Sequence, residues 1–228
     1  MTKVTKNGVI ALSIVTLTII VIFVINCCVS PLPLGNVVQI KCQVEYIEYY
    51  DEYIKPNGWQ GSGVFIDDNL ILTAGHIVDG IGEATVITVD GKVYEAKSWY
   101  LETEADIGFI EVDTNDVEHR LFFGDAKLGE TVYAYGNPLG VFPVLTKGIV
   151  SAIDMFDDYG FTKNMIITDA AINPGNSGCP LFDKYGTILG ICSWGYTNSQ
   201  GMSYFVRAEV IKLSLKKYKA IRALEEVK

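Results

Sequence analysis

Two short stretches of the sequence combine residue types that suit nucleophilic catalysis. One is LTAGH at residues 72–76, and the other is NPGNSG at residues 173–178. A serine hydroxyl is a weak nucleophile at neutral pH, so it needs an imidazole to accept its proton and a carboxylate to orient that imidazole. The two stretches together predict His76 as a general base and Ser177 as a nucleophile.

The chain has two histidines, and their surroundings differ. His76 follows an apolar run and a glycine, whereas His119 lies in the polar stretch DVEHR, which is typical of a solvated surface. This contrast favours His76 as the catalytic imidazole.

A carboxylate between the two stretches completes the set. Asp106 stands directly before the apolar run at residues 107–112, so it can be buried at the end of a strand and reach the imidazole. Other aspartates nearby, such as Asp90 and Asp113, lie in contexts with glycine or asparagine that are typical of turns. We therefore predict Asp106 as the third member.

The glycines around Ser177 have a use of their own. A tight turn at this point can direct the backbone N–H groups of Gly175 and Ser177 at one position, where they would form an oxyanion hole. A loop without catalytic activity can carry the same glycines, and short motifs have high false-positive rates. The motif alone leaves a turn and a nucleophile equally open.

The composition limits the other classes of function. The formal net charge of −9 argues against nucleic-acid binding, because such proteins use lysine and arginine to neutralise phosphates. The five cysteines show no spacing typical of a zinc site or a disulfide scaffold. We expect no metal, no cofactor and no nucleic-acid partner.

The N-terminal leader is apolar over a length that suits a membrane span. Residues 9–29 carry no charge and follow Lys3 and Lys6. A spanning helix needs about 20 apolar residues, whereas the apolar core of a cleaved signal peptide usually has about 7–15. We therefore predict a transmembrane signal-anchor at residues 9–29. The positive-inside rule then places residues 1–8 in the cytoplasm and the rest of the chain outside it.

Two other fates of the leader stay open. Cleavage after Ser30 would give a secreted protein, and Cys27 could carry a lipid anchor. In each case residues 30–36 (SPLPLGN) would form a short linker, because prolines and a glycine interrupt helices. The folded domain is then expected at residues 37–228.

From residue 37 to residue 206 the sequence alternates short β-type runs with Gly, Asn and Asp. This pattern predicts an all-β domain built as a sandwich or as barrels. Twelve runs are expected to form strands: residues 37–44, 63–66, 70–73, 84–89, 92–100, 107–112, 131–135, 146–153, 165–168, 180–182, 187–193 and 202–206.

The end of the chain has a helical pattern instead. Within residues 208–227, Ile211, Leu215, Tyr218 and Leu224 fall at spacings suited to one helical face. We expect this helix to pack its apolar stripe on the domain, since helices gain most of their stability in this way.

Taken together, these stretches resemble the trypsin-like serine proteases, and among them the HtrA (Deg) type. Seven blocks match in the family's order, at residues 61–66, 72–76, 105–108, 136–140, 148–151, 168–178 and 188–191. The resemblance implies two six-stranded antiparallel β-barrels, at about residues 37–125 and 126–206, with the helix following. It also implies a triad of His76 and Asp106 on the first barrel with Ser177 on the second. Gly175 and Ser177 would donate the hydrogen bonds of the oxyanion hole.

The sequence also departs from the family pattern. Asn176 stands where digestive enzymes have the aspartate that pairs with a newly cut N-terminus, so we do not expect that activating salt bridge. Nothing after the helical stretch resembles the PDZ domains of many Deg proteases, so a protease domain without one is expected. Cys179 replaces a usual glycine.

The resemblance further implies a pocket for the substrate side chain before the scissile bond. Ala171, six residues before the nucleophile, would lie at its base, where an aspartate would select arginine or lysine. The walls and the adjoining substrate-binding strand would consist of Ile172, Cys192, Ser193, Trp194, Gly195 and Ser203. These residues predict cleavage of protein or peptide substrates after uncharged, small to medium apolar residues.

The predicted function is thus that of a membrane-anchored serine endopeptidase that works through an acyl-enzyme. One alternative is a catalytically inactive relative that uses the protease fold as a binding module. Another is a transmembrane scaffold whose domain only meets partners. Neither alternative has a chemical need for the complete triad.

Cys179 and Cys192 leave two states open. If a hairpin forms in which Phe182 faces Leu189, then Cys179 faces Cys192 within the reach of a disulfide. Two small buried thiols are the favoured alternative, because this is a common role for free cysteine.

Overall fold

The computed structural model describes residues 32–43, 58–114, 121–140, 143–154, 164–195 and 201–225. These residues belong to one compact unit that begins at Leu32. The predicted signal-anchor at residues 9–29 lies outside the described residues. Within the described part of the chain, no helix is both long and apolar enough to cross a membrane.

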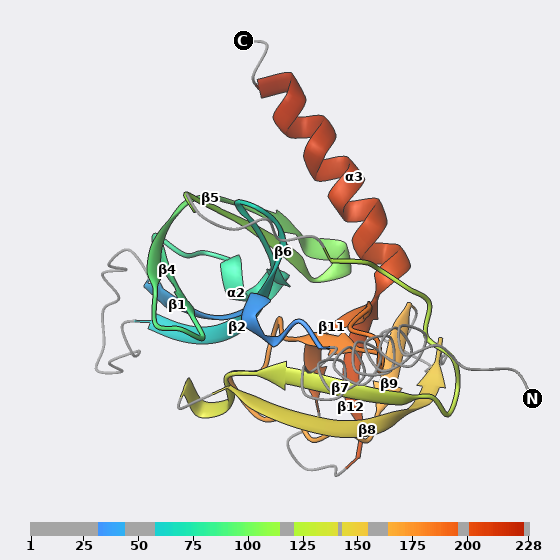
Figure 1. Ribbon diagram of the computed structural model, residues 1–228. Coiled ribbons are helices and arrows are strands. Elements are labelled where there is room, and N and C mark those ends of the chain that lie inside the picture. Colours follow the sequence, from blue (N-terminus) through green and yellow to red (C-terminus); the bar gives the residue numbers. More distant parts are fainter. Residues whose placement is uncertain are drawn as a thin grey trace, which may run out of the picture. The chain divides into compact units, whose positions relative to one another are not determined.

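The described residues contain twelve strands, which close into two antiparallel barrels of six strands each (Figure 1). The first barrel, in the order β1-β2-β3-β6-β5-β4, consists of β1 (Val37–Gln43), β2 (Gly58–Asp67), β3 (Leu70–Ala74), β4 (Glu83–Thr88), β5 (Val93–Glu102) and β6 (Ile107–Val112). The second barrel, in the order β10-β11-β12-β9-β8-β7, consists of β7 (Thr131–Gly136), β8 (Val144–Ile153), β9 (Met165–Thr168), β10 (Pro180–Phe182), β11 (Ile188–Gly195) and β12 (Ser203–Arg207). The predicted double-barrel fold is confirmed.

Short helical segments precede or connect the strands, and one long helix follows them. They are η1 (Leu34–Asn36), α2 (Gly75–Val78), η2 (Thr103–Ala105), η3 (Pro138–Gly140) and α3 (Ala208–Glu225). The predicted C-terminal helix is thus confirmed as α3.

Three apolar clusters form the core, and one of them lies between the barrels. Ile71 belongs to the cluster inside the first barrel, and Phe205 belongs to the cluster inside the second. The third cluster joins side chains of both barrels, such as Phe109 of β6 and Ile191 of β11. Because burial of apolar surface is favourable by roughly 25 cal/mol per Å², this third cluster holds the barrels against each other.

Strand β6 has a nearly continuous apolar sequence because both of its faces are buried. Ile107 and Phe109 belong to the cluster between the barrels, whereas Ile110 and Val112 belong to the cluster inside the first barrel. Successive side chains of a strand point to opposite faces, so both faces of β6 are buried. Asp106, the residue before this strand, is therefore placed where the two barrels meet.

Helix α3 continues from the second barrel and packs on the first. Ile211 and Tyr218 are buried in the cluster between the barrels. The ring of Tyr218 stacks on Phe109 with the centroids 5.0 Å apart. Its hydroxyl donates a hydrogen bond to Glu111, which also accepts hydrogen bonds from Arg222 at 2.8 and 2.9 Å. The helix therefore fastens the two barrels together.

The expectation that Leu224 shares the buried face of this helix is wrong. Ile211 and Tyr218 are buried and Leu215 is partly buried, but Leu224 is 70% exposed. Arg222 makes the contact with Glu111, and the helix then extends past it, away from the barrels (Figure 1). Its final turn has no barrel surface on which to bury an apolar side chain.

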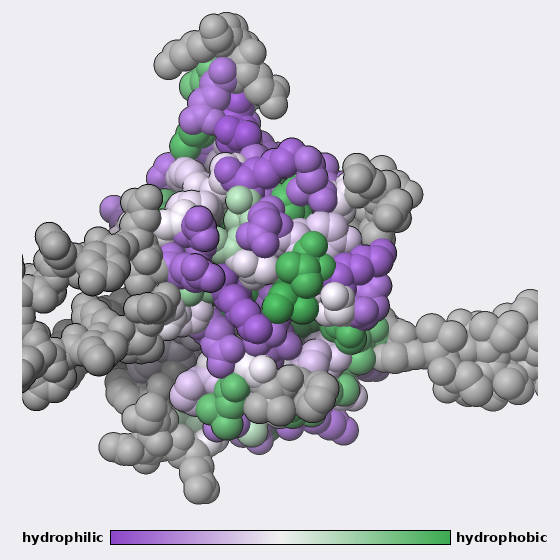
Figure 2. Space-filling view, turned by 90° about the vertical axis from the view of Figure 1, so that its left-hand side faces the viewer, coloured by the Kyte–Doolittle hydropathy of each residue, from purple (hydrophilic) through white to green (hydrophobic). Residues whose placement is uncertain are grey.

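The face of the molecule in Figure 2 is mostly hydrophilic, and its apolar areas are few and separated. This pattern is expected where strands place their apolar side chains inside the barrels and their polar side chains in solvent. The hydrophilic side chains of the chain thus cover most of this face.

Replacement of Tyr218 should separate the two ways in which α3 is held. Tyr218→Phe keeps the ring stacking and loses the hydrogen bond to Glu111, so the free energy of unfolding should fall by about 1 kcal/mol. Tyr218→Ala loses both, and the fall should be about 3 kcal/mol or more. Urea unfolding followed by tryptophan fluorescence measures these changes.

The control for this experiment is Leu224→Ala, at the exposed end of the same helix. It should change the free energy of unfolding by less than about 0.5 kcal/mol, as exposed substitutions usually do. A loss for Leu224→Ala as large as that for Tyr218→Ala would contradict the packing described here.

Candidate active site

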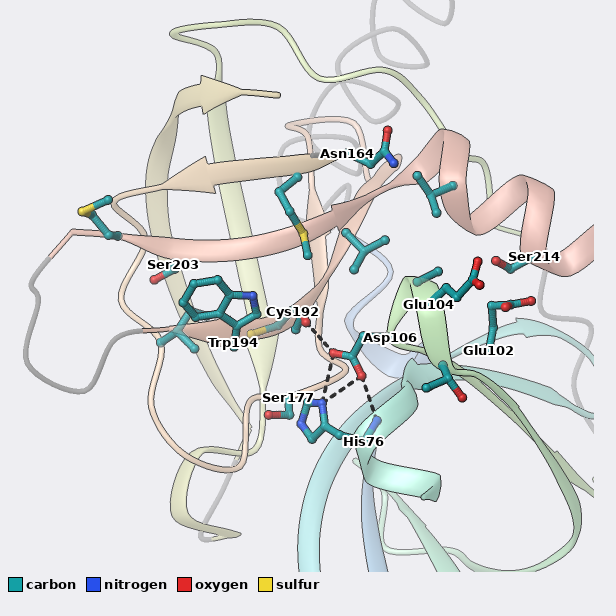
Figure 3. A pocket seen from close by; sticks show the side chains of 18 of the residues that line it. His76, Glu102, Glu104, Asp106, Asn164, Ser177, Cys192, Trp194, Ser203 and Ser214 are labelled. Atoms are coloured by element: carbon teal, nitrogen blue, oxygen red, sulfur yellow. Dashed lines mark hydrogen bonds and ion pairs between the residues drawn. The ribbon is translucent and has the colours of Figure 1, made fainter. Parts of the chain in front are cut away.

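The three residues of the predicted triad line one cleft between the barrels (Figure 3). His76 belongs to α2, directly after β3, and Asp106 follows η2, directly before β6. β3 and β6 are paired with Ala74 opposite Ile107, so the ends of the two strands bring His76 next to Asp106. Ser177 comes from the loop between β9 and β10 of the second barrel.

His76 and Asp106 are in direct contact. Nδ1 of the imidazole lies 3.1 Å from Oδ1 and 3.0 Å from Oδ2 of the carboxylate. The backbone N–H of His76 also donates a hydrogen bond to Oδ1 at 2.8 Å. Because an ionised carboxylate only accepts hydrogen bonds, Nδ1 of the neutral imidazole carries the proton and Nε2 presents a lone pair.

The backbone around the two residues allows this contact. A Cβ atom added to Gly75 would lie 2.9 Å from the nitrogen of Ile107 and 3.0 Å from the carbonyl carbon of Asp106. No side chain fits at such distances, so the glycine of the LTAGH stretch is required by the close approach of the backbones. Asp106 itself has a φ of 50°, in the left-handed region, where the chain turns from η2 into β6.

The surroundings of Asp106 keep its carboxyl group ionised. Burial raises the pKa of this group, but hydrogen bonds from His76, the charge of the imidazolium and a hydrogen bond from the hydroxyl of Ser193 outweigh that effect. The resulting pKa lies below the usual value of 3.8. At neutral pH the carboxylate can therefore orient the imidazole and stabilise its protonated form.

Ser177 stands beside the imidazole at the mouth of the cleft (Figure 3). Within the described residues its hydroxyl makes no hydrogen bond with His76. Such contacts are often long or poorly aligned when no substrate is bound, and they tighten in the complex. The backbone carbonyl of Ser177 accepts the N–H of Ser62 at 2.8 Å, which ties this loop to β2 of the first barrel.

The peptide before Gly175 has a defined direction. The carbonyl of Pro174 accepts the N–H of Leu139 at 2.8 Å. In a trans peptide the N–H points opposite to the carbonyl, so the N–H of Gly175 points away from Leu139. This N–H donates no hydrogen bond within the described part of the chain. Gly175 has a φ of 98°, a conformation that favours glycine.

The peptide before Ser177 is held in the same manner. The carbonyl of Asn176 accepts the N–H of Cys179 at 2.8 Å, so the N–H of Ser177 points the other way. Among the described residues, this N–H also has no acceptor. Gly175 and Ser177 together line a small hollow next to His76. Donors without an acceptor are what an oxyanion hole needs, so the prediction for Gly175 and Ser177 stays open.

The cleft is large enough for an extended peptide. Its volume of about 1530 Å³ exceeds the roughly 300–1,000 Å³ of typical small-molecule pockets. Six of the seven residues predicted to bind substrate line it: Ala171, Ile172, Cys192, Ser193, Trp194 and Ser203. Gly195, the seventh, stands at the end of β11, paired with Ser203 of β12.

Several features of the cleft were missed by reasoning from the sequence. The hydroxyl of Ser193 donates to Asp106, so it supports the carboxylate besides lining the cleft. Past Asp106, the cleft continues along α3, where Glu104 lines it and Lys217 pairs with Glu102 at 2.6 Å. These charged side chains have no local sequence signal, because they meet only when α3 packs on the first barrel.

Cys179 and Cys192 are buried thiols, as the favoured alternative expected. They face each other across β10 and β11, since the N–H of Cys192 donates to the carbonyl of Cys179 at 2.8 Å. Burial, followed by the neighbouring Cys192, raises the pKa of Cys179 well above its ordinary value. A thiol in this state is a poor nucleophile.

The expected register of this hairpin is wrong in one detail. Phe182 pairs with Ile188 and not with Leu189, and a β-bulge follows between Phe182 and Leu181. The turn closes through a hydrogen bond from the N–H of Asp183 to the carbonyl of Thr187, which makes the loop one residue shorter than expected. The bulge absorbs that residue, so the two cysteines still face each other.

Comparison with known proteins was made for sequence and for fold. Residues 61–191 match the family described as "Trypsin-like peptidase domain". The chain is 37% identical over 157 residues to a probable periplasmic serine endoprotease DegP-like of Halomonas elongata, covering 66% of this chain and 33% of that protein. It is 36% identical over 168 residues to the serine protease Do-like HtrA of Bacillus subtilis, covering 67% and 37%. The chain thus spans about one third of the length of these curated relatives.

Solved structures share the architecture. The serine endoprotease from Yersinia pestis superimposes with a TM-score of 0.67 at 23% identity, covering 81% of this chain and 62% of that one. The HtrA-type protease AlgW, solved with a tripeptide, gives a TM-score of 0.69 at 26% identity, covering 82% and 60%. The first of these likenesses concerns the fold alone.

Proposed function

Because this chain belongs to the family of trypsin-like peptidase domains and has HtrA-type relatives, as its sequence predicted, we propose that it is a serine endopeptidase. His76, Asp106 and Ser177 form its catalytic triad. The observation that carries this proposal is the contact between the imidazole of His76 and the carboxylate of Asp106, in the cleft that Ser177 also lines.

The first step forms an acyl-enzyme. Nε2 of His76 takes the proton of the Ser177 hydroxyl while the oxygen bonds to the carbonyl carbon of the substrate, whose electron pair moves to the carbonyl oxygen. The N–H groups of Gly175 and Ser177 stabilise that oxyanion. The bond to the leaving amine then breaks, and the imidazolium gives its proton to this amine.

The second step returns the enzyme to its starting state. His76 accepts a proton from water, the resulting hydroxide attacks the ester carbon, and Ser177 leaves with the proton of the imidazolium. In both steps the ionised carboxylate of Asp106 holds Nδ1–H and stabilises the positive ring. The lowered pKa of Asp106 suits this role, since the group keeps its charge as the ring gains one.

Ser177→Ala should abolish labelling by a fluorophosphonate probe, because this reagent bonds only to an activated serine. Ser177→Ala and His76→Ala should each lower turnover of a peptide substrate on the order of a millionfold, since the triad acts as one unit. Labelling and turnover are measured on the same preparations.

The control is Ser98→Ala, which removes a serine hydroxyl of the first barrel that donates to Glu111 and not to the triad. It should keep both labelling and turnover. Either triad variant keeping more than about a hundredth of the activity would contradict the assignment. An unlabelled wild-type chain would favour the alternative of a binding module.

Specificity follows from two uncharged residues that line the cleft. Ala171 and Ile172 line the cleft near Ser177 and offer no charge to a basic side chain. Asp169 is the nearby carboxylate in this lining, and its Oδ1 accepts the N–H of Ile149 at 2.7 Å. The enzyme therefore cleaves after small to medium apolar residues.

Peptides with alanine, valine or methionine before the scissile bond should have a kcat/KM at least about tenfold higher than peptides with lysine or arginine. Ala171→Asp should reverse this order, because a carboxylate at the base of the pocket pairs with a basic side chain. Ala171→Asn is the matched control, equal in size but uncharged. A wild-type preference for lysine or arginine would overturn the apolar pocket and point to Asp169.

The leader anchors this protease to a membrane. Residues 9–29 are uncharged and long enough to span the bilayer, with lysines on the expected cytoplasmic side. The periplasmic relatives support a domain outside the cytoplasm. The full chain should stay with membranes after alkaline carbonate washing, whereas a chain starting at residue 32 should not. Release of the full chain by the wash would contradict the anchor.

A further inference from the structure

The oxyanion turn, residues 175–177, contains a glycine, a residue that can adopt several backbone conformations at little cost. Gly175 has no Cβ to restrict it, so the direction of its N–H depends on what holds the peptides on either side. Leu139 holds the preceding peptide, through the carbonyl of Pro174. The peptide between Gly175 and Asn176 needs partners of its own.

The N–H of the peptide that follows Gly175 belongs to Asn176 and donates to the carbonyl of Asn173 at 3.0 Å. Ser62 of β2 holds the carbonyl of this peptide. Its hydroxyl donates a hydrogen bond to the carbonyl of Gly175 at 2.8 Å and accepts one from the backbone N–H of Asn137 at 2.9 Å. Ser62 is 0% exposed, so these bonds do not compete with solvent. The side chain of Asn137 in turn donates to the carbonyl of Val38 at 3.0 Å, which fixes the segment that follows β7.

The backbone of Ser62 makes a further tie. Its N–H donates to the carbonyl of Ser177 at 2.8 Å, and its carbonyl accepts the hydroxyl of Thr73 at 2.7 Å. Ser62 therefore contacts the turn at both residues whose N–H groups face the oxyanion. It does so from the barrel that also carries His76 and Asp106.

The residue between those two donors does not anchor the turn in this way. Asn176 is 4% exposed, and its side-chain oxygen has no hydrogen-bond partner among the described residues. A buried amide oxygen without a partner contributes a cost and no hold. Backbone hydrogen bonds within the loop that carries this turn engage the N–H and the carbonyl of Asn176. The carbonyl of Gly175 has its partner outside the loop, and that partner is the hydroxyl of Ser62.

We propose that Ser62 is the positioning residue of the oxyanion hole. Its hydroxyl accepts the N–H of Asn137 and donates to the carbonyl of Gly175. These two bonds keep the turn in the conformation in which the N–H groups of Gly175 and Ser177 point at the oxyanion. This role rests on the proposed peptidase function. Ser62 is fully buried and touches no substrate, so it acts through Gly175. The side-chain oxygen of Asn176, the next residue, does not replace this hydrogen bond.

Loss of the hydroxyl has a predictable effect. The carbonyl of Gly175 and the N–H of Asn137 lose their partner, and among the described residues the peptide after Gly175 is then held only through the N–H of Asn176, which donates to the carbonyl of Asn173. The hole is then complete in only a fraction of the molecules. Since oxyanion donors act in the transition state and not on bound substrate, kcat should fall while KM changes little.

The test compares Ser62→Ala with Ser98→Ala, which also removes one serine hydroxyl of the first barrel, but one that donates to Glu111 and not to the turn. Active sites are first counted by fluorophosphonate titration, so that kcat refers to folded, reactive enzyme. Removal of a whole oxyanion donor costs about 10²–10³ in kcat, so Ser62→Ala should lose about tenfold to a hundredfold. Ser98→Ala should stay within about twofold.

Two further readouts distinguish positioning from a general loss of structure. A peptide aldehyde, whose adduct with Ser177 places an oxygen in the hole, should bind more weakly in the same proportion as kcat falls. The corresponding peptide alcohol, which forms no adduct, should bind as before.

A kcat per titrated site within about twofold of wild type would overturn the role of Ser62, as would an equal loss in binding of aldehyde and alcohol. If Ser62→Ala shows no thermal unfolding transition, Ser62→Cys, assayed in reductant, replaces it. A thiol keeps the size and donates only weakly, so a smaller loss in the same direction is expected. A wild-type chain that neither labels nor hydrolyses would instead end the proposed function, and this inference with it.

Discussion

Apolar packing between the two barrels is the interaction on which the rest of the structure depends. His76 and Asp106 belong to the first barrel and Ser177 to the second, so the cleft exists only while the barrels hold one relative position. That position is set by a cluster that joins β6 with β11 and β12 and includes Ile211 and Tyr218 of α3. Since this packing carries no directional chemistry, hydrogen bonds at its edge must set the finer geometry.

Those hydrogen bonds cross between the barrels at the turn that carries Ser177. Ser62 and Asn137 come from different barrels. The backbone N–H of Asn137 donates to the hydroxyl of Ser62, and Ser62 is fully buried. Glycines permit the approach: a Cβ on Gly178 would lie 2.2 Å from the carbonyl of Ser62. Any larger residue would force the barrels apart at this point, so the glycine next to Ser177 serves packing as well as the turn.

Helix α3 connects fold and cleft from the other side. It leaves the second barrel, crosses to the first and stacks Tyr218 on Phe109, three residues along β6 from Asp106. The same helix supplies Lys217 to the wall of the cleft, where it pairs with Glu102. The part of the cleft beyond Asp106 thus belongs to both barrels, and its charge pattern depends on the seating of the helix.

The sequence by itself determined the strands, the order of the motifs and the three residues of the proposed triad. Alternation of apolar residues and turn residues is local, and the apolar run of β6 predicted both a buried strand and a carboxylate, Asp106, at its end. The tertiary structure alone decided the contacts between distant segments. The exposure of Leu224, the bulge beside Phe182 and the hydrogen bond from Ser62 to Gly175 each depend on which surface lies opposite. Local pattern carries no information about that surface, because burial and hydrogen bonding across 113 residues of chain are settled only when the barrels close and pack together.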